Sequence, residues 1–143
     1  MLSKIYLILA FIILLIFAIL LGAQLQQTQK LNQALKTLKS PQASKERSYD
    51  KSFKLANLYF KKGMHNEAIQ EYTYCLEVWD KNDRLGIVFL LNRLVLTYSL
   101  LKENAVALYY CKTALDVAPS SSQSLLNLNR LYELNKTASL SKT

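Results

Sequence analysis

The first hydrophobic stretch of the chain has no polar interruption. From Ile5 to Ala23, nineteen consecutive residues carry neither a charge nor an amide side chain. An α-helix of that length spans about 28 Å, which matches the ~30 Å hydrocarbon core of a bilayer. A helix of a soluble domain needs one polar side, and this stretch lacks it. The pattern predicts a transmembrane helix at 5–23, preceded by an N-terminal tail at 1–4.

A cleaved secretory signal is the alternative interpretation of the same residues. Such a signal has an apolar run of about 7–15 residues followed by a small-x-small cleavage site. The run here is longer, and Leu21 stands where a small residue is expected before a cut after Ala23. The length therefore favours an uncleaved anchor.

The charges on either side of the span predict its orientation. Only Lys4 and the terminal amine precede it, whereas five basic residues follow it: Lys30, Lys36, Lys39, Lys45 and Arg47. Basic residues close to the end of a span favour the cytoplasmic side of the membrane. We therefore expect a single-pass protein whose remaining residues lie on the cytoplasm-like side.

Leucine spacing predicts a helical stalk after the span. Leu31, Leu35 and Leu38 recur at intervals of four and three residues, which places them on one side of a helix. Ser40-Pro41 ends this helix, because the residue before a proline avoids the helical backbone conformation. Residues 24–47 are therefore expected to form a helical stalk and a polar linker.

The helical pattern then repeats with a fixed period. Residues 49–82 and 88–121 are two copies of one 34-residue pattern, in which Tyr59 aligns with Tyr98 and Ala68 with Ala107. Small side chains at equivalent points let two helices approach closely where they cross. Each copy is therefore expected to form a pair of packed helices joined by a turn.

A third, partial copy follows the second. Residues 122–136 place leucines on one side of a helix, and no second helix is predicted after them. We expect a capping helix at 122–136 and a frayed tail at 137–143.

The apolar run from Leu85 to Leu101 raises the alternative of a second membrane span. Asn92 and Arg93 lie at its centre, and a central arginine costs about 2.5–3.5 kcal/mol on insertion scales. The run is also in register with the repeat. We therefore expect a buried helix of the second copy, lengthened backward past Gly86 into an insert at 83–87.

Composition and charge exclude several classes of function. Gly and Pro are scarce, with three and two residues, which argues against an all-β fold. The net charge of +8 comes from the stretch beside the membrane, whereas a nucleic-acid-binding domain normally carries its own basic surface. Cys75, Cys111 and His65 lack metal-ligand spacing, and no phosphate loop or catalytic triad is present. We therefore expect no enzyme, metal, cofactor, nucleic acid or small-molecule substrate.

The repeated unit resembles the tetratricopeptide repeat (TPR) at most of its signature positions. The first copy carries them at Leu55, Ala56, Tyr59, Gly63, Ala68, Tyr72 and Cys75, and the second at Leu94, Tyr98, Ala107, Ala114 and Pro119. In the second copy Lys102 stands where glycine is usual. The resemblance implies an all-α fold, with one N-terminal transmembrane helix followed by a short solenoid of stacked helix pairs.

In such a solenoid the first helices of the repeats line a concave groove that binds protein partners. The repeat register gives the groove candidates as Phe53, Lys54, Asn57, Phe60, Lys61, Phe89, Asn92, Arg93, Leu96, Leu100, Leu126, Asn127 and Arg130. Some TPR domains hold a peptide carboxylate with a fixed polar set; Asn57 fits that set, but Phe53 replaces its lysine. The alternative is that Phe60, Phe89 and Leu96 pack under the insert or the stalk.

The whole chain resembles the plastid-encoded and cyanobacterial TPR proteins implicated in photosystem I assembly. The resemblance lies in one N-terminal span, a short linker and two to three repeats. It implies a thylakoid membrane protein facing the stroma, a scaffold role, and photosystem I subunits or assembly intermediates as partners. The alternative is an anchored TPR subunit of a bacterial envelope or secretion complex.

Overall fold

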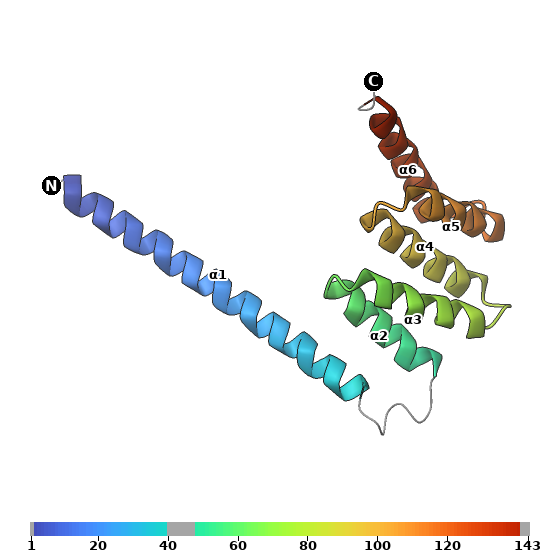
Figure 1. Ribbon diagram of the computed structural model, residues 1–143, viewed down its shortest axis with the longest axis horizontal. Coiled ribbons are helices and arrows are strands. Elements are labelled where there is room, and N and C mark those ends of the chain that lie inside the picture. The colour runs from blue at the N-terminus through green and yellow to red at the C-terminus, as the bar shows by residue number, and fades with distance from the viewer. Residues whose placement is uncertain (1, 40–47, 141–143) are drawn as a thin grey trace.

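The computed structural model describes residues 2–39 and 48–140, and within these residues the chain consists of α-helices joined by turns, without a strand. The all-α fold class is therefore confirmed. Figure 1 shows a long N-terminal helix beside a stack of shorter ones. The helices are α1 (Leu2–Leu38), α2 (Tyr49–Lys61), α3 (His65–Val78), α4 (Arg84–Leu100), α5 (Asn104–Val117) and α6 (Ser122–Leu140).

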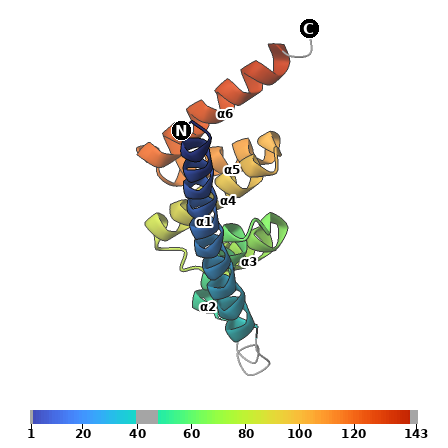
Figure 2. The ribbon, with the colours of Figure 1, turned by 90° about the vertical axis from the view of Figure 1, so that its left-hand side faces the viewer.

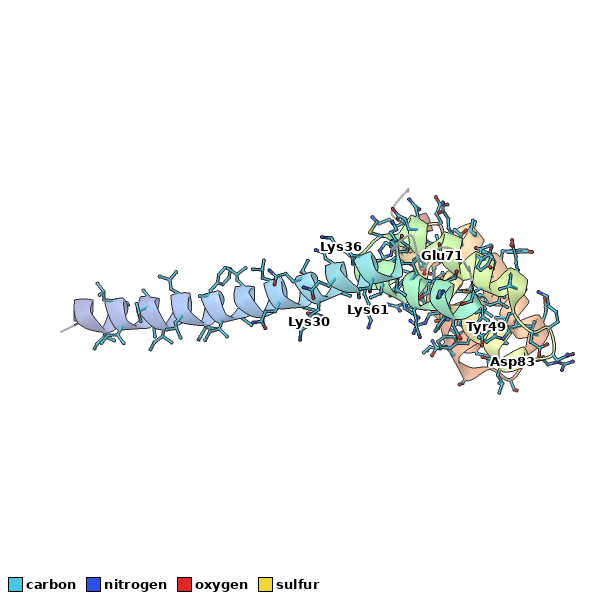
Figure 3. The ribbon with its side chains drawn as sticks, turned by 90° about the horizontal axis from the view of Figure 1, so that it is seen from below. Lys30, Lys36, Tyr49, Lys61, Glu71 and Asp83 are labelled. Carbon is cyan, nitrogen blue, oxygen red and sulfur yellow. The ribbon has the colours of Figure 1, made fainter. Side chains whose placement is uncertain are left out.

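Helix α1 joins the expected span and the expected stalk in one continuous helix. Its apolar side chains from Ile5 to Leu21 are exposed, and Figure 3 shows nothing packed against them. Lys30 and Lys36 lie on the part of α1 nearer to the other helices (Figure 3). Among the described residues, α1 is the one helix found to be long and apolar enough to cross a membrane. The expected linker at 41–47 lies outside the described residues.

The other helices stack as successive pairs. Helix α2 packs on α3 and α4 on α5, while α3 also contacts α4 and α5 contacts α6 (Figures 1 and 2). The first pair lies within residues 49–82, and the second lies within 88–121 except for the start of α4 at Arg84. This arrangement is that of a helical-repeat solenoid, in which each pair contacts only its neighbours.

Alanines lie where the paired helices cross. Ala68 and Ala107, which occupy the same place in the two stretches, are completely buried. Ala56 and Ala114 are buried as well, and Tyr72 fills space beside Ala68 in the main core cluster. The absence of a large side chain at these points lets the helix backbones approach closely, as the sequence predicts.

The second run of apolar residues forms helix α4 inside the solenoid. Val88, Leu90, Leu91, Leu94 and Val95 are all buried, because α4 is covered by α3, α5 and α6. This burial on several sides explains why the run has no polar face. The expectation of a buried repeat helix holds, and α4 begins at Arg84, within the insert as expected.

The start of α4 is fixed by a cap at Asp83. Its carboxylate accepts hydrogen bonds from the Gly86 backbone N–H at 3.0 Å and from the Trp79 indole N–H at 3.1 Å. The bond from Gly86, followed by that from Trp79, holds the pKa of Asp83 below its ordinary value. The indole covers Gly86 so closely that a Cβ at that position would overlap it. Glycine is therefore required here for close packing.

Helix α6 is longer than the sequence predicted. The expected frayed tail began at residue 137, but the helix continues to Leu140, and only residues 141–143 lie outside the described part. The frayed-tail prediction was therefore wrong for residues 137–140. No glycine or proline interrupts this stretch, and the Thr137 hydroxyl donates to the Leu134 carbonyl at 2.9 Å within the helix.

Helices α2 and α4 end in the same way, with a residue in the left-handed conformation. After α2, Gly63 has φ 75°, and after α4, Lys102 has φ 62°. The backbone N–H of each of these residues donates to the carbonyl three residues earlier. The N–H of the following residue donates to the carbonyl five residues earlier, which is that of Tyr59 after α2 and that of Tyr98 after α4. This is the Schellman arrangement, which favours glycine because a Cβ is strained at positive φ.

Replacing Lys102 by glycine should stabilise the protein. The left-handed backbone costs a non-glycine residue about 1 kcal/mol, so Lys102→Gly should raise the free energy of unfolding by about that amount. Thermal unfolding in detergent, followed by circular dichroism, measures it. Gly63→Ala is the matched control and should destabilise by a similar amount. A lower melting temperature for Lys102→Gly would contradict the assigned backbone conformation.

Candidate functional site

A groove of about 900 Å³ lies between α4 and α6. It is lined by Leu85, Val88, Phe89, Asn92, Arg93, Leu96, Ser121, Gln123, Leu126, Asn127, Asn129, Arg130 and Glu133. Seven of the thirteen residues that the repeat register gave as groove candidates are among them, from Phe89 on α4 to Arg130 on α6. The two helices are the first helices of their repeats, as the register requires.

Apolar side chains are exposed along this groove. Leu126 is 63% exposed and Phe89 47%, and Leu85, at the start of α4, is 81% exposed. The Arg93 guanidinium lies 5.1 Å from the centre of the Phe89 ring. This cation–π contact holds the charge against the apolar wall of the groove.

The floor of the groove is a polar network that joins α4 to α6. The Asn92 amide donates to the Ser124 hydroxyl at 3.0 Å, and the Asn127 amide donates to the Asn92 side-chain carbonyl at 2.8 Å. The Ser124 hydroxyl also bonds to Ser121 at 2.9 Å, and Ser124 is completely buried. A partly buried hydrogen-bond network of this kind fixes the spacing of the helices that it joins.

Cys111 supports the same network from below. Its thiol donates to the Ser124 backbone carbonyl at 3.2 Å, and burial raises its pKa above the ordinary value. The Cys111 thiolate is therefore disfavoured, and both Cys111 and Cys75 are buried. Within the described ranges no three His, Cys, Asp or Glu side chains converge as metal ligands.

Four of the five candidates from the first repeat lie in a separate cavity of about 420 Å³. It is lined by Leu38, Phe53, Lys54, Asn57, Leu58 and Lys61. Leu38 belongs to the last turn of α1, so the stalk borders this cavity. The Phe53 and Phe89 rings, 5.9 Å apart, lie at the junction between the cavity and the groove. The structure thus divides the expected continuous groove into two parts.

Asn57 has its hydrogen bonds satisfied inside the first repeat. The Tyr72 hydroxyl donates to the Asn57 side-chain carbonyl at 2.8 Å, and the Asn57 amide donates to the Phe53 backbone carbonyl at 2.9 Å. Burial raises the pKa of Tyr72, which therefore stays protonated as the donor. The side chain that matches the TPR carboxylate-binding set is therefore engaged in structure.

Two candidates line neither cavity. Phe60 packs against the main core cluster, and its ring lies 5.7 Å from that of His65. Leu100 is at the C-terminal end of α4 and is 52% exposed. The sequence left open whether Phe60, Phe89 and Leu96 pack under the insert or the stalk. Phe89 and Leu96 line the groove, whereas Phe60 packs against the core cluster beside His65 of α3.

The structure also adds groove residues that the register did not single out. They are Leu85, Val88, Ser121, Gln123, Asn129 and Glu133. Glu133 follows Arg130 by three residues, so helical spacing alone places it on the same side of α6. Ser121 directly precedes α6, and Gln123 lies in its first turn. Both line the groove because α6 packs against α4, and no sequence spacing predicts this contact.

Comparison with known proteins gives one weak relative. No protein-family model matches the chain. Over 90 residues the chain is 30% identical to the uncharacterized protein ycf37 of Guillardia theta, a match that covers 63% of this chain and 49% of that protein. The matched part thus spans about half the length of this curated relative.

Proposed function

We propose that the protein is a membrane-anchored TPR scaffold that holds a protein partner in the groove between α4 and α6. One observation carries the proposal: exposed apolar side chains of both helices line a concave surface beside Arg93. Monomeric proteins rarely expose large apolar patches unless these bind something. A helical segment of a partner suits a groove of this shape and composition.

We further propose that this scaffold belongs to the TPR family implicated in photosystem I assembly, and that it acts at the thylakoid membrane with its repeats facing the stroma. The single N-terminal apolar helix, the stacked helix pairs and the similarity to ycf37 support this assignment. Its partners are photosystem I subunits or assembly intermediates. Anchoring raises the effective concentration of the groove for membrane partners, so a weak contact suffices.

Affinity capture with groove variants tests the scaffold role. The full chain is captured from detergent-solubilised thylakoids, and photosystem I subunits are quantified by mass spectrometry. Arg93→Glu combined with Leu126→Ala should abolish their recovery, because it reverses the charge and removes apolar contact area on the two opposing walls.

The matched control carries the same kinds of change outside the groove. Tyr109 and Lys112 are exposed on α5, so Tyr109→Ala with Lys112→Glu should leave recovery unchanged. Equal recovery with both variants would contradict the groove as the binding surface. Recovery of envelope or secretion subunits in place of photosystem I subunits would contradict the assigned family.

A further inference from the structure

The position of the solenoid relative to α1 is fixed by contacts at the end of that helix. Leu35 is only 8% exposed and belongs to the main core cluster together with Ala56 and Tyr59 of α2. Lys62 donates to the side-chain carbonyl of Asn32, and the Lys39 ammonium lies 5.4 Å from the centre of the Tyr59 ring. Because α1 is one continuous helix, these contacts also orient the solenoid relative to the apolar half of α1.

From this junction the solenoid turns back along α1. In Figure 1, α2 lies near the C-terminal end of α1, and the stack runs from there to α6, whose C-terminal end lies farthest from that junction. In Figure 2, α6 lies level with the N-terminal part of α1, whereas α2 lies beside its C-terminal end. Among the helices of the solenoid, α6 therefore lies farthest from the C-terminal end of α1 and closest to the level of its apolar half.

The last turns of α6 project beyond the rest of the solenoid. Leu131 is the last buried residue of α6 among those whose side chains are described. Beyond it Tyr132 is 51% exposed and Leu134 43% exposed. Lys136 follows Tyr132 by one turn and is also exposed. This end of the helix thus presents an aromatic, an aliphatic and a basic side chain outside the protein core.

We propose that the C-terminal end of α6 rests on the surface of the same bilayer that holds α1. The proposal depends on the anchoring by α1 described above. Tyrosine and lysine are residues that place an apolar body in the interfacial region and a polar end in water, and Leu134 adds apolar area. Contact at this second point limits the tilt and rotation of the solenoid, so it fixes the height at which the α4–α6 groove stands above the membrane.

Lipid proximity of three labelled positions tests this contact in the full chain. Single cysteines at Leu134, Lys112 and Leu14 carry an environment-sensitive fluorophore, since the native Cys75 and Cys111 are buried. The chain is reconstituted in nanodiscs that contain lipids with a nitroxide quencher in the headgroup or in the acyl chain. Leu134→Cys should lose fluorescence with headgroup quenchers, Lys112→Cys on α5 should not, and Leu14→Cys should lose it with acyl-chain quenchers.

The outcomes separate the two claims. Quenching at position 14 without quenching at 134 overturns the α6 contact and leaves anchoring intact, whereas no quenching at 14 overturns anchoring itself. Equal quenching at 134 and 112 also overturns the proposal, because it indicates a domain that lies on lipid without a defined orientation.

Hydrogen exchange of the chain without a fluorophore gives an independent check. In nanodiscs, the last amides of α6 should exchange more slowly in the unmodified chain than in a variant with Tyr132→Asp and Leu134→Asp. Equal exchange in the two proteins counts against the contact.

Discussion

Truncating Leu94 to alanine should lower the free energy of unfolding by about 2–5 kcal/mol. Leu94 is completely buried in the main core cluster, where α4 meets the first helix pair. Removal of a buried leucine costs the lost transfer free energy and adds the cost of the cavity that remains. Because a short solenoid has few interfaces between its repeats, this cavity weakens the main contact that couples the two pairs.

The aligned position of the first repeat provides a matched control. Leu55 occupies the same place in its repeat but is only partly buried. Leu55→Ala should therefore cost less than Leu94→Ala, although the chemical change is identical. Urea unfolding of the full chain in detergent, followed by circular dichroism, gives both values. Equal losses of unfolding free energy in the two variants would show that the deeper burial of Leu94 at the repeat interface does not determine the stability.

The repeat positions could be predicted from the sequence because they depend on local spacing. Ala68 and Ala107 are buried at helix crossings, and Gly63 ends α2 in the left-handed conformation, as their place in the pattern required. Lys102 adopts the same conformation despite its side chain. The repeat architecture therefore overrides the preference of the residue at that turn.

The shape of the candidate site depends on contacts between distant segments, which the spacing did not contain. Repeat register placed Phe53 and Leu126 in one groove, but the end of α1 borders the cavity at Phe53 and leaves the α4–α6 groove as a separate surface. The bond from Asn127 to Asn92 connects residues 35 positions apart. Neither feature has a periodic signal, so each required the three-dimensional structure.

The stalk has a role in the solenoid that explains the small number of repeats. A helical repeat cannot bury its apolar face alone, and three or more are normally needed for stability. Here the C-terminal end of α1 packs on α2 and contributes Leu35 to the core. It thus covers the first repeat as the second helix of a preceding repeat would, and α6 covers the other end of the stack.

Leu35→Asp should detach α1 from the solenoid and expose the first repeat. The substitution removes a buried leucine and places a charge against Ala56 and Tyr59, so the helix separates from α2 instead of burying the carboxylate. Loss of about 2 kcal/mol of docking free energy corresponds to roughly thirtyfold faster exchange of the α2 amides that open with this contact.

Hydrogen–deuterium exchange of the full chain in nanodiscs measures this effect helix by helix. Amides of α2 should exchange faster in Leu35→Asp, while those of α5, which belongs to the second helix pair, should keep their rates. Gln33→Asp introduces the same charge on the exposed side of α1 and is the matched control. Unchanged exchange in α2 would mean that α1 serves only as a tether. Faster exchange there, with α5 unaffected, would mean that α1 and the solenoid form one folded unit, since the helix that carries the apolar stretch then also completes the core of the first repeat.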